Sequence, residues 1–170
     1  MEFREVKIKD ICTILNGRAY KREELLKEGK YKVLRVGNFF TKEDWYYSDL
    51  ELDDDKYCFN GDLLYAWSAN FGPKIWNENK TIYHYHIWKI ILNNNIDKYF
   101  LYYKLQLLTT RIKQQSHGSV MLHLTKTDME NLKINIPQYS DQIKIGKILS
   151  TIDKKIQINN HINDNLEYVA

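Results

Sequence analysis

The sequence has few prolines, glycines and cysteines, and it has no long hydrophobic run. Its two prolines, Pro73 and Pro137, stand apart, so the Asn-Pro-Pro-Tyr type of motif that holds a flipped base in amino-methyltransferases is absent. No glycine-rich turn follows a predicted strand, and no Gly-x-x-x-x-Gly-Lys-Ser/Thr loop occurs. The chain therefore lacks the signatures of a methyltransferase and of a nucleoside-triphosphate motor, and we expect it to bind no cofactor itself.

Cysteine is also scarce. Cys12 and Cys58 are too few and too isolated for a disulfide framework or a zinc cluster. No window of about 18 consecutive apolar residues occurs, which argues against a membrane span. The first residues, Met1–Glu5, lack the apolar stretch of a signal peptide. We therefore expect a cytoplasmic protein with reduced thiols and no bound metal.

Aromatic residues and segregated charge are abundant. The chain contains 13 tyrosines, six phenylalanines and four tryptophans, a surplus of amphipathic rings that suits a binding surface as well as a core. Residues 16–42 carry eight lysines and arginines against three glutamates, and residues 104–126 carry four and no acid, whereas residues 43–55 hold seven carboxylates and no base. This separation indicates a basic face, as nucleic-acid binding requires; ordinary surface scatter is the alternative.

Hydrophobic periodicity predicts an α/β (α+β) domain with mixed and antiparallel strands over residues 1–138. The expected elements are, in chain order, a helix over 6–15, a strand over 31–37, loop and strand edge over 43–56, a strand over 63–67, a turn at 71–73, a strand over 81–92, a helix over 97–115 and a strand over 132–136.

The remaining residues, 139–170, are of a different kind. Ser140 is a plausible helix N-cap, Asp141 is placed to interact with the helix dipole, and no proline follows. Apolar residues recur at heptad spacing through almost four heptads, which predicts a coiled-coil helix of about 30 residues that pairs with a second helix, either as a homodimer or with another chain. The alternative is a helix packed back on its own domain. The predicted seam consists of Ile145, Ile148, Leu149, Ile152, Ile156, Asn159, Ile162 and Leu166.

Polar and basic loops supply what reading DNA requires, namely donors and acceptors for base edges and cations for phosphates. Three loops fit, at 17–22, 67–70 and 116–126. Arg35 and Asn38, on or after the strand that follows the first loop, are added because arginine pairs with guanine and asparagine with adenine. For each loop alone, an ordinary polar connection is the alternative. The candidate DNA-binding residues are Arg18, Tyr20, Lys21, Arg22, Arg35, Asn38, Trp67, Ser68, Asn70, Lys74, Ser116, His117, Ser119, His123 and Lys126.

Two other groups of side chains offer metal ligands. Glu51 and Asp53–Asp55 supply carboxylates that a metal-dependent nuclease uses, but consecutive residues point in different directions, so an exposed acidic turn is favoured. His84 and His86 share a face of the predicted strand, yet no third ligand is evident, so core or surface histidines are favoured. A stand-alone nuclease and an RNA- or protein-binding module are the alternative functions.

Three blocks resemble the target-recognition half-repeat of the specificity subunits of type I restriction-modification systems. Residues 8–17, Ile-Lys-Asp-Ile-Cys-x-Ile-x-x-Gly, are similar to the opening block of that family, and residues 60–64, Asn-Gly-Asp-Leu-Leu, to its Lys-Gly-Asp-Ile-Leu strand. Residues 136–153, Ile-Pro-x-x-x-Asp-Gln-x-x-Ile-x-x-x-Leu-x-x-x-Asp, resemble the entry into its long helix. Asp141 stands where glutamate is usual and Gln138 where a second proline is common, and neither change alters the capping.

The resemblance implies a non-catalytic subunit that reads double-stranded DNA. Its partners would be modification subunits, which methylate adenine with S-adenosylmethionine, and a translocating restriction subunit; S-adenosylmethionine, ATP and magnesium would be bound by those partners. A complete subunit of the family has two such halves in tandem. This chain holds one, so it is expected to be a truncation or one of two copies that pair through residues 140–169 and read an interrupted palindrome.

Overall fold

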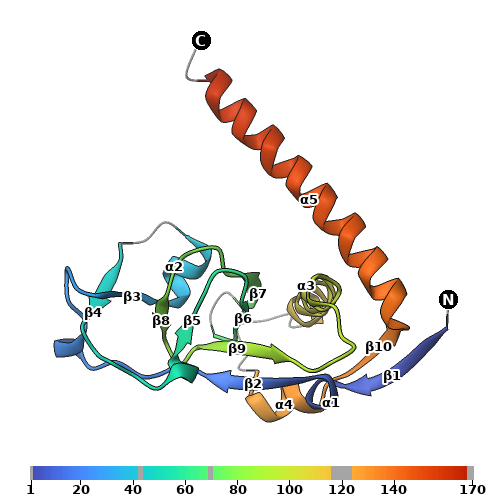
Figure 1. The fold of residues 1–170 in the computed structure, drawn as a ribbon, viewed down its shortest axis with the longest axis horizontal. Coiled ribbons are helices and arrows are strands. Elements are labelled where there is room, and N and C mark those ends of the chain that lie inside the picture. The colour runs from blue at the N-terminus through green and yellow to red at the C-terminus, as the bar shows by residue number, and fades with distance from the viewer. Residues whose placement is uncertain (1, 42–43, 69–70, 116–123, 168–170) are drawn as a thin grey trace.

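The computed structural model describes residues 2–41, 44–68, 71–115 and 124–167. Two four-stranded sheets and a two-stranded ribbon form the domain, and a long helix leaves it at its C-terminal end (Figure 1). The α/β fold and the long helix predicted from the sequence are confirmed. The elements are β1 (Phe3–Lys7), α1 (Ile8–Ile11), β2 (Cys12–Asn16), η1 (Arg22–Glu24), β3 (Tyr31–Leu34), α2 (Val36–Phe40), β4 (Tyr46–Ser48), η2 (Asp54–Lys56), β5 (Tyr57–Cys58), β6 (Leu63–Ala66), β7 (Gly72–Ile75), β8 (Thr81–Tyr83), β9 (Ile87–Leu92), α3 (Lys98–Gln115), α4 (Lys126–Asn131), β10 (Lys133–Pro137) and α5 (Tyr139–Glu167).

The first sheet has the order β2-β9-β6-β7 and is antiparallel throughout. Its inner strand β9 buries residues on both faces, since Ile87 belongs to one core cluster and Trp88 and Ile90 to another. Helix α3 covers this sheet, since Leu101 and Leu105 belong to the same core cluster as Trp88 and Ile90. The helix predicted over these residues is confirmed.

The second sheet has the order β4-β3-β8-β5 and contains one parallel pair, β3 with β8. Val33 and Ile82, at its centre, are fully buried. A second core cluster joins Leu34 and Tyr83 of this sheet to Leu64 of the first. The two sheets therefore pack on each other, and the segments that connect them are brought together at the junction.

The N-terminal segment differs from the prediction. The helix predicted over 6–15 is wrong, because only the single turn α1 is helical and strands flank it on both sides. Residues of β2 alternate, with Cys12 and Ile14 buried and Thr13 exposed, and they pair with β9. The apolar spacing fits both periods, and β-branched residues favour extended backbone where a neighbouring strand offers hydrogen bonds.

Two strands are shorter than predicted. The strand predicted over 81–92 is divided by a turn at 84–86 into β8 and β9, which belong to different sheets. The strand predicted over 31–37 ends at Leu34, where helix α2 follows. In both places a long run of β-forming residues conceals a change of direction that long-range packing imposes.

The turn predicted at 71–73 is also wrong, because Gly72 and Pro73 belong to strand β7. Gly72 takes φ 151°, which glycine accepts readily, and proline is tolerated because β7 lies at the edge of its sheet. The strands predicted over 63–67 and 132–136 are confirmed as β6 and β10.

Helix α5 is anchored to the domain along its first half and then leaves it (Figure 1). Gln142 is buried, and its side-chain oxygen accepts a hydrogen bond from the backbone nitrogen of Asp97 at 3.0 Å. At the midpoint of the helix, Asp153 accepts a hydrogen bond from the hydroxyl of Tyr103 on α3 at 2.7 Å. Residues 154–165 are all exposed. Packing back on its own domain, the alternative for this helix, thus applies only to the first half.

Gly146 sets how closely α5 approaches α3. A Cβ atom there would lie 2.5 Å from Oδ1 of Asp97 and 3.0 Å from the backbone nitrogen of Phe100. We expect Gly146→Ala to lower the free energy of unfolding by about 1–3 kcal/mol, because the methyl group forces the two helices apart. Glycine to alanine in an open helix raises stability by up to about 1 kcal/mol, so unchanged or higher stability in chemical denaturation would contradict this contact. Lys147→Ala, at the exposed next position, is the control.

Candidate nucleic-acid interface

Segments distant in the sequence meet at residues 84–86, the turn that joins β8 of one sheet to β9 of the other; we call it the histidine turn. The backbone nitrogen of Arg18 donates a hydrogen bond to the carbonyl of Tyr83 at 3.0 Å, and that of Tyr85 donates to the carbonyl of Arg18 at 3.0 Å. On the other side, the backbone nitrogen of Trp67 donates to the carbonyl of His86 at 3.0 Å. The loops that follow β2 and β6 are thereby fixed against this turn.

Aromatic rings cover the histidine turn. The rings of Trp67 and His86 meet edge to face with centroids 4.9 Å apart, and Tyr20 stacks on His84 at 6.3 Å. The indole Nε1 of Trp67 donates to the carbonyl of Tyr85 at 2.8 Å, while the ring of Tyr85 is exposed. Rings with accessible faces and polar edges are the side chains that stack on bases and hydrogen-bond to them.

Arg18 shapes the loop after β2. Its guanidinium makes two hydrogen bonds to the carboxylate of Glu24, at 2.7 and 2.8 Å, and lies over the ring of Tyr20 at 5.1 Å. The backbone nitrogen of Lys21 donates to the same carboxylate at 2.8 Å. The bonds from Arg18 and then from Lys21 lower the pKa of Glu24 to about 2. Since its fork is occupied by Glu24, Arg18 holds the loop in place, whereas Lys21 and Arg22 are exposed on it.

Arg35 stands at the end of β3, directly before helix α2, and is partly exposed. Its guanidinium lies over the ring of Tyr46 with 5.1 Å between the central carbon and the ring centroid. A guanidinium supported on a ring in this way keeps its hydrogen-bond donors at the edge free to point outward, in the fork that suits guanine.

His84 is uncharged at neutral pH. Burial, followed by the neighbouring charges of His86 and Arg35, lowers its pKa to about 4. A neutral imidazole has one donor and one acceptor nitrogen, and Nδ1 of His84 accepts a hydrogen bond from the backbone nitrogen of His86 at 3.4 Å, which leaves Nε2 as an uncharged donor for a base edge. Arg35, which contributes to this shift, is therefore close to the histidine turn.

The candidate DNA-binding residues predicted from the sequence are placed differently by the fold: some are brought together, Asn38 and Lys74 lie beside these, one lies apart, and the rest lie outside the described residues. Arg18, Tyr20, Arg35 and Trp67 are brought together, and Lys21, Arg22 and Ser68 continue the same loops. Lys126 lies apart, on α4, where it pairs with Glu130 at 3.5 Å. Five further candidates lie outside the described residues: Asn70, Ser116, His117, Ser119 and His123.

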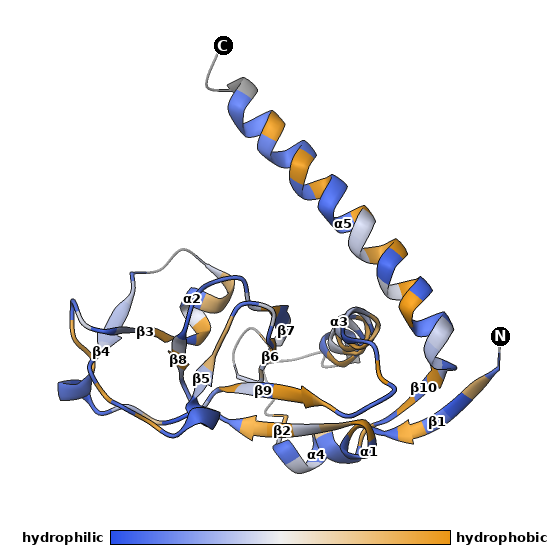
Figure 2. Ribbon diagram, viewed as in Figure 1, coloured by the Kyte–Doolittle hydropathy of each residue, from blue (hydrophilic) through white to orange (hydrophobic). Residues whose placement is uncertain are grey.

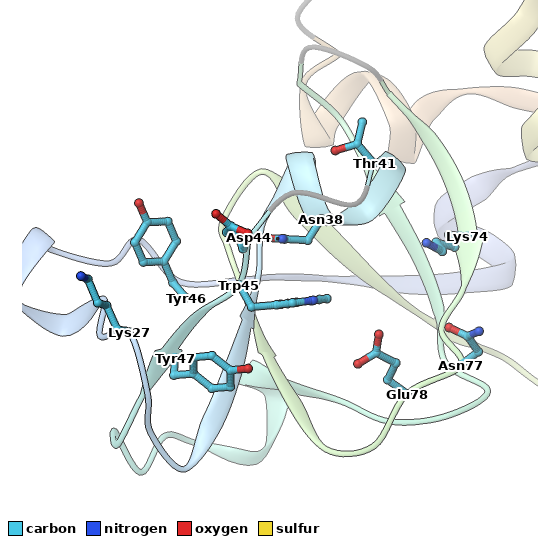
Figure 3. Close-up of a pocket in the computed structure, with 10 residues that line it drawn as sticks. All are labelled: Lys27, Asn38, Thr41, Asp44, Trp45, Tyr46, Tyr47, Lys74, Asn77 and Glu78. Atoms are coloured by element: carbon cyan, nitrogen blue, oxygen red, sulfur yellow. Dashed lines mark hydrogen bonds between the residues drawn. The ribbon is translucent and has the colours of Figure 1, made fainter.

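Asn38 and Lys74 lie beside the cluster, around a hollow of about 850 Å³ (Figure 3). Asn38 is buried and its amide donates to the backbone carbonyl of Asp44 at 3.1 Å. Lys74 donates to the carbonyl of Phe39 at 2.8 Å. Both side chains have structural contacts that the sequence did not reveal, so a base-reading role for Asn38 would require it to give up its bond to Asp44.

The sequence reasoning missed the histidine turn itself. On sequence alone, His84 and His86 are favoured as core or surface histidines of a continuous strand, and Tyr85 between them has no predicted role in binding. The signal that was available is the alternation of histidine and tyrosine in residues 83–86, four rings that an ordinary buried strand does not need. Their proximity to Arg18 and Trp67 depends on sheet pairing, which the sequence alone does not give.

The acidic segment has a structural explanation. Asp53 precedes the short helix η2, and Asp55 pairs with Lys56 at 2.7 Å. Glu51 accepts hydrogen bonds from the hydroxyl of Tyr31 and from Lys30. Among the described residues, no three histidine, cysteine, aspartate or glutamate side chains gather in a way that fits a metal ion.

Helix α5 carries an uncovered apolar stripe over residues 148–162. Ile148, Ile152, Ile156 and Ile162 are each about half exposed or more, and they alternate with polar residues along the projecting helix (Figure 2). Asn159 is exposed on the same stripe. Of the other predicted seam residues, Ile145 packs against the core and Leu149 is partly buried, while the side chain of Leu166 lies outside the described residues.

Solved specificity subunits of type I restriction-modification systems have the same architecture, a domain of this kind followed by a long helix. The HsdS subunit from Thermoanaerobacter tengcongensis shares the fold with a TM-score of 0.72 and 18% identity, over 92% of this chain and 38% of that one. The S subunit from M. genitalium gives a TM-score of 0.69 at 18% identity, over 92% and 40% of the two chains. At this identity the likeness concerns the fold alone.

The sequence defines the family. The model of the type I restriction modification DNA specificity domain matches residues 1–168, and the chain belongs to that family. The MjaVIII specificity subunit of Methanocaldococcus jannaschii is 33% identical over 58% of this chain and 25% of its own length. The HindI specificity subunit of Haemophilus influenzae is 26% identical over 76% of this chain and 26% of its own length. The resemblance seen in the sequence is confirmed.

The chain spans about a quarter of the length of these curated relatives and about two fifths of the solved subunits. Within the described residues, no helix combines the length and the apolarity needed to cross a membrane.

His84 makes stability depend on pH in mild acid. Because its pKa is lowered from 6.5 to about 4 in the folded chain, the unfolded chain binds the proton more tightly, and folding stability is lost as the pH falls below about 6.5. We expect the chain to lose about 1–2 kcal/mol more between pH 7 and pH 5 than His84→Asn does, in urea denaturation at the two pH values. His161→Asn, on the exposed half of α5, is the control, and equal losses in the chain and in His84→Asn would contradict the burial of a neutral imidazole.

Proposed function

We propose that this chain reads the base sequence of double-stranded DNA, as the target-recognition half of a type I specificity subunit. The observation that carries the proposal is the convergence of the loops after β2 and β6, together with Arg35, on the histidine turn. Membership in the specificity-domain family supports it.

The chemistry of the site fits the major groove. Arg35 presents a guanidinium fork braced by Tyr46, which suits the two acceptors of guanine. Neutral His84 offers the donor Nε2, and the hydroxyl of exposed Tyr85 can both donate and accept, as discrimination between bases requires. Lys21 and Arg22, exposed on the same loop, add charge for neighbouring phosphates.

Catalysis belongs to partner subunits in this proposal. We infer that modification subunits methylate adenine with S-adenosylmethionine, and that a restriction subunit uses ATP and magnesium. This chain would only recognise the target sequence. One solved structure of similar fold, with a TM-score of 0.73 to this chain, comes from work on complex assembly of the type I R-M system. We infer that the chain acts in the cytoplasm, where the substrates of such a complex are found.

The stripe on α5 supports pairing with a second helix. Exposed isoleucines on a helix that leaves its own domain remain in water unless another helix covers them. We infer that a second copy, or a second half-repeat of a longer chain, provides that helix. Asn159 on the stripe would then fix the register, as a polar residue at a seam position does. Two identical copies would read an interrupted palindrome.

Arg35→Ala tests base reading. In a complex assembled with modification subunits, we expect this variant to lose about 1–3 kcal/mol of discrimination between the target and a one-base variant of it, measured by anisotropy of labelled duplexes. Arg35→Lys should lose discrimination too, because lysine keeps the charge without the fork. Arg4→Ala, exposed on β1, is the control. Equal weakening on every sequence would make Arg35 a phosphate contact, and a wild-type complex without any sequence preference would overturn the proposed function.

Ile152→Asp with Ile162→Asp tests pairing through α5. A self-paired chain has twice the mass of 20.4 kDa, and we expect the double variant to return to the single mass in light scattering coupled to gel filtration, with the domain still folded by circular dichroism. Charges placed on the stripe oppose its burial against another helix. Lys147→Asp with Asn160→Asp, off the stripe, is the control. A wild-type chain of single mass would exclude self-pairing.

A further inference from the structure

A groove follows residues 74–80, between the second sheet and the base of α5. It consists of three connected hollows of about 440, 850 and 360 Å³. Tyr47, Asn77 and Glu78 line both the first and the second, and Lys74 and Asn77 line both the second and the third. We call it the lysine groove, because the cations that line it are Lys27, Lys30, Lys32, Lys74, Lys80 and Lys154.

The lining of the groove has an excess of positive charge. Six lysines face three carboxylates, those of Asp44, Glu78 and Asp153. Glu78 already pairs with Lys32 at 2.7 Å, and Asp153 accepts the hydroxyl of Tyr103. The groove as a whole therefore attracts anions.

Aromatic rings hold several of these lysines in place. The ammonium nitrogen of Lys80 lies 3.8 Å from the ring centroid of Tyr57, and that of Lys32 lies 4.8 Å from Trp45. Lys74 lies 5.5 Å from Phe39 and keeps two of its three donors beyond its bond to the Phe39 carbonyl. A ring fixes an ammonium group without using its hydrogen-bond donors, so the donors that Glu78 does not take from Lys32, and that the Phe39 carbonyl does not take from Lys74, stay available to a ligand.

The distribution of these cations suits a chain of phosphates rather than one small anion. They are spread along connected, open hollows, with Lys27 and Lys74 on opposite sides of the middle one (Figure 3). The groove lining contains no arginine, whereas Arg18, Arg22 and Arg35 all belong to the loops and strand end around the histidine turn. Lysine is a point charge that contacts phosphate without the planar fork that reads guanine.

The two surfaces are continuous. Tyr46 lines the groove and also supports the guanidinium of Arg35. At the other end, Lys154 and Gln157 extend the groove onto α5. We propose that the lysine groove is a phosphate track, which takes one sugar–phosphate backbone of the duplex whose bases are read at the histidine turn. This inference rests on the proposed function, and it assigns the sequence-independent part of DNA binding to lysines between the second sheet and α5.

The triple variant Lys27→Gln, Lys80→Gln and Lys154→Gln tests the track. Each lost phosphate contact lowers the slope of the logarithm of affinity against the logarithm of salt concentration by about 0.9. We expect the triple variant to lower the slope by about 2–3 and to weaken binding by the same factor on target and random duplexes, so that the ratio of the two affinities stays at the wild-type value. Anisotropy across a salt series, on the full chain with and without modification subunits, gives both quantities.

The matched control removes three lysines elsewhere: Lys9→Gln, Lys133→Gln and Lys147→Gln, all exposed. It should leave the slope unchanged, and circular dichroism should show both variants folded. A groove variant with the slope of the wild type, or of the control, would overturn the track while leaving base reading intact. A slope that is unchanged together with weaker assembly with modification subunits would make the groove a protein-docking surface instead. A wild-type chain that binds no duplex in either form would overturn both the track and the proposed function.

Discussion

The close approach of two backbones at Gly17 is the constraint on which the interface depends. A Cβ atom at this position would lie 2.3 Å from the carbonyl oxygen of His84, closer than any side chain allows. The glycine lets the chain leave β2 and turn directly against the end of β8, where Arg18 then exchanges two backbone hydrogen bonds with residues 83–85. A larger residue would separate the loop from the turn and would also part the two sheets that the turn connects.

The same junction explains why the sequence predicts some elements and not others. Helices α3 and α5 and strand β10 depend on local periodicity and, for β10, on a terminating proline, and both signals can be recognised in the sequence. The predicted N-cap of α5, Ser140, lies inside the helix, which begins at Tyr139. The segment 6–15 satisfies a helical stripe and a strand alternation equally well, and pairing with β9 decides between them. Strand 81–92 looks continuous because each half is rich in β-branched and aromatic residues, while the break at 84–86 exists to pass the chain from one sheet to the other.

The candidate site follows the same division. The polar and basic loops, and Arg35, could be identified from residue chemistry, since the side chains that read bases are few in kind. What was not predictable is which of them are already engaged: Arg18 is bound by Glu24 six residues later, and Asn38 is bound by the carbonyl of Asp44. Composition gives the donors that a loop contains, but only the folded chain shows which donors remain directed outward.

Most of the bonds that hold the histidine turn are made by backbone atoms. The nitrogen and carbonyl of residue 18, the nitrogen of Trp67 and the carbonyls of Tyr83 and His86 form the clamp. Side chains add the bond from the indole of Trp67 to the carbonyl of Tyr85, the bond from the hydroxyl of Tyr20 to the carbonyl of Tyr83 at 3.5 Å, and the bond that Nδ1 of His84 accepts from the nitrogen of His86 at 3.4 Å. Side chains such as those of Arg35 and Tyr85 can therefore be exchanged without removing any of the hydrogen bonds that position the loops. In the proposed function, a change of base-reading residues would therefore alter which sequence is bound, while the lysines of the adjacent groove would keep the general attraction to DNA. A scaffold with this separation would accept a new target through substitutions at its surface, at little cost to the fold.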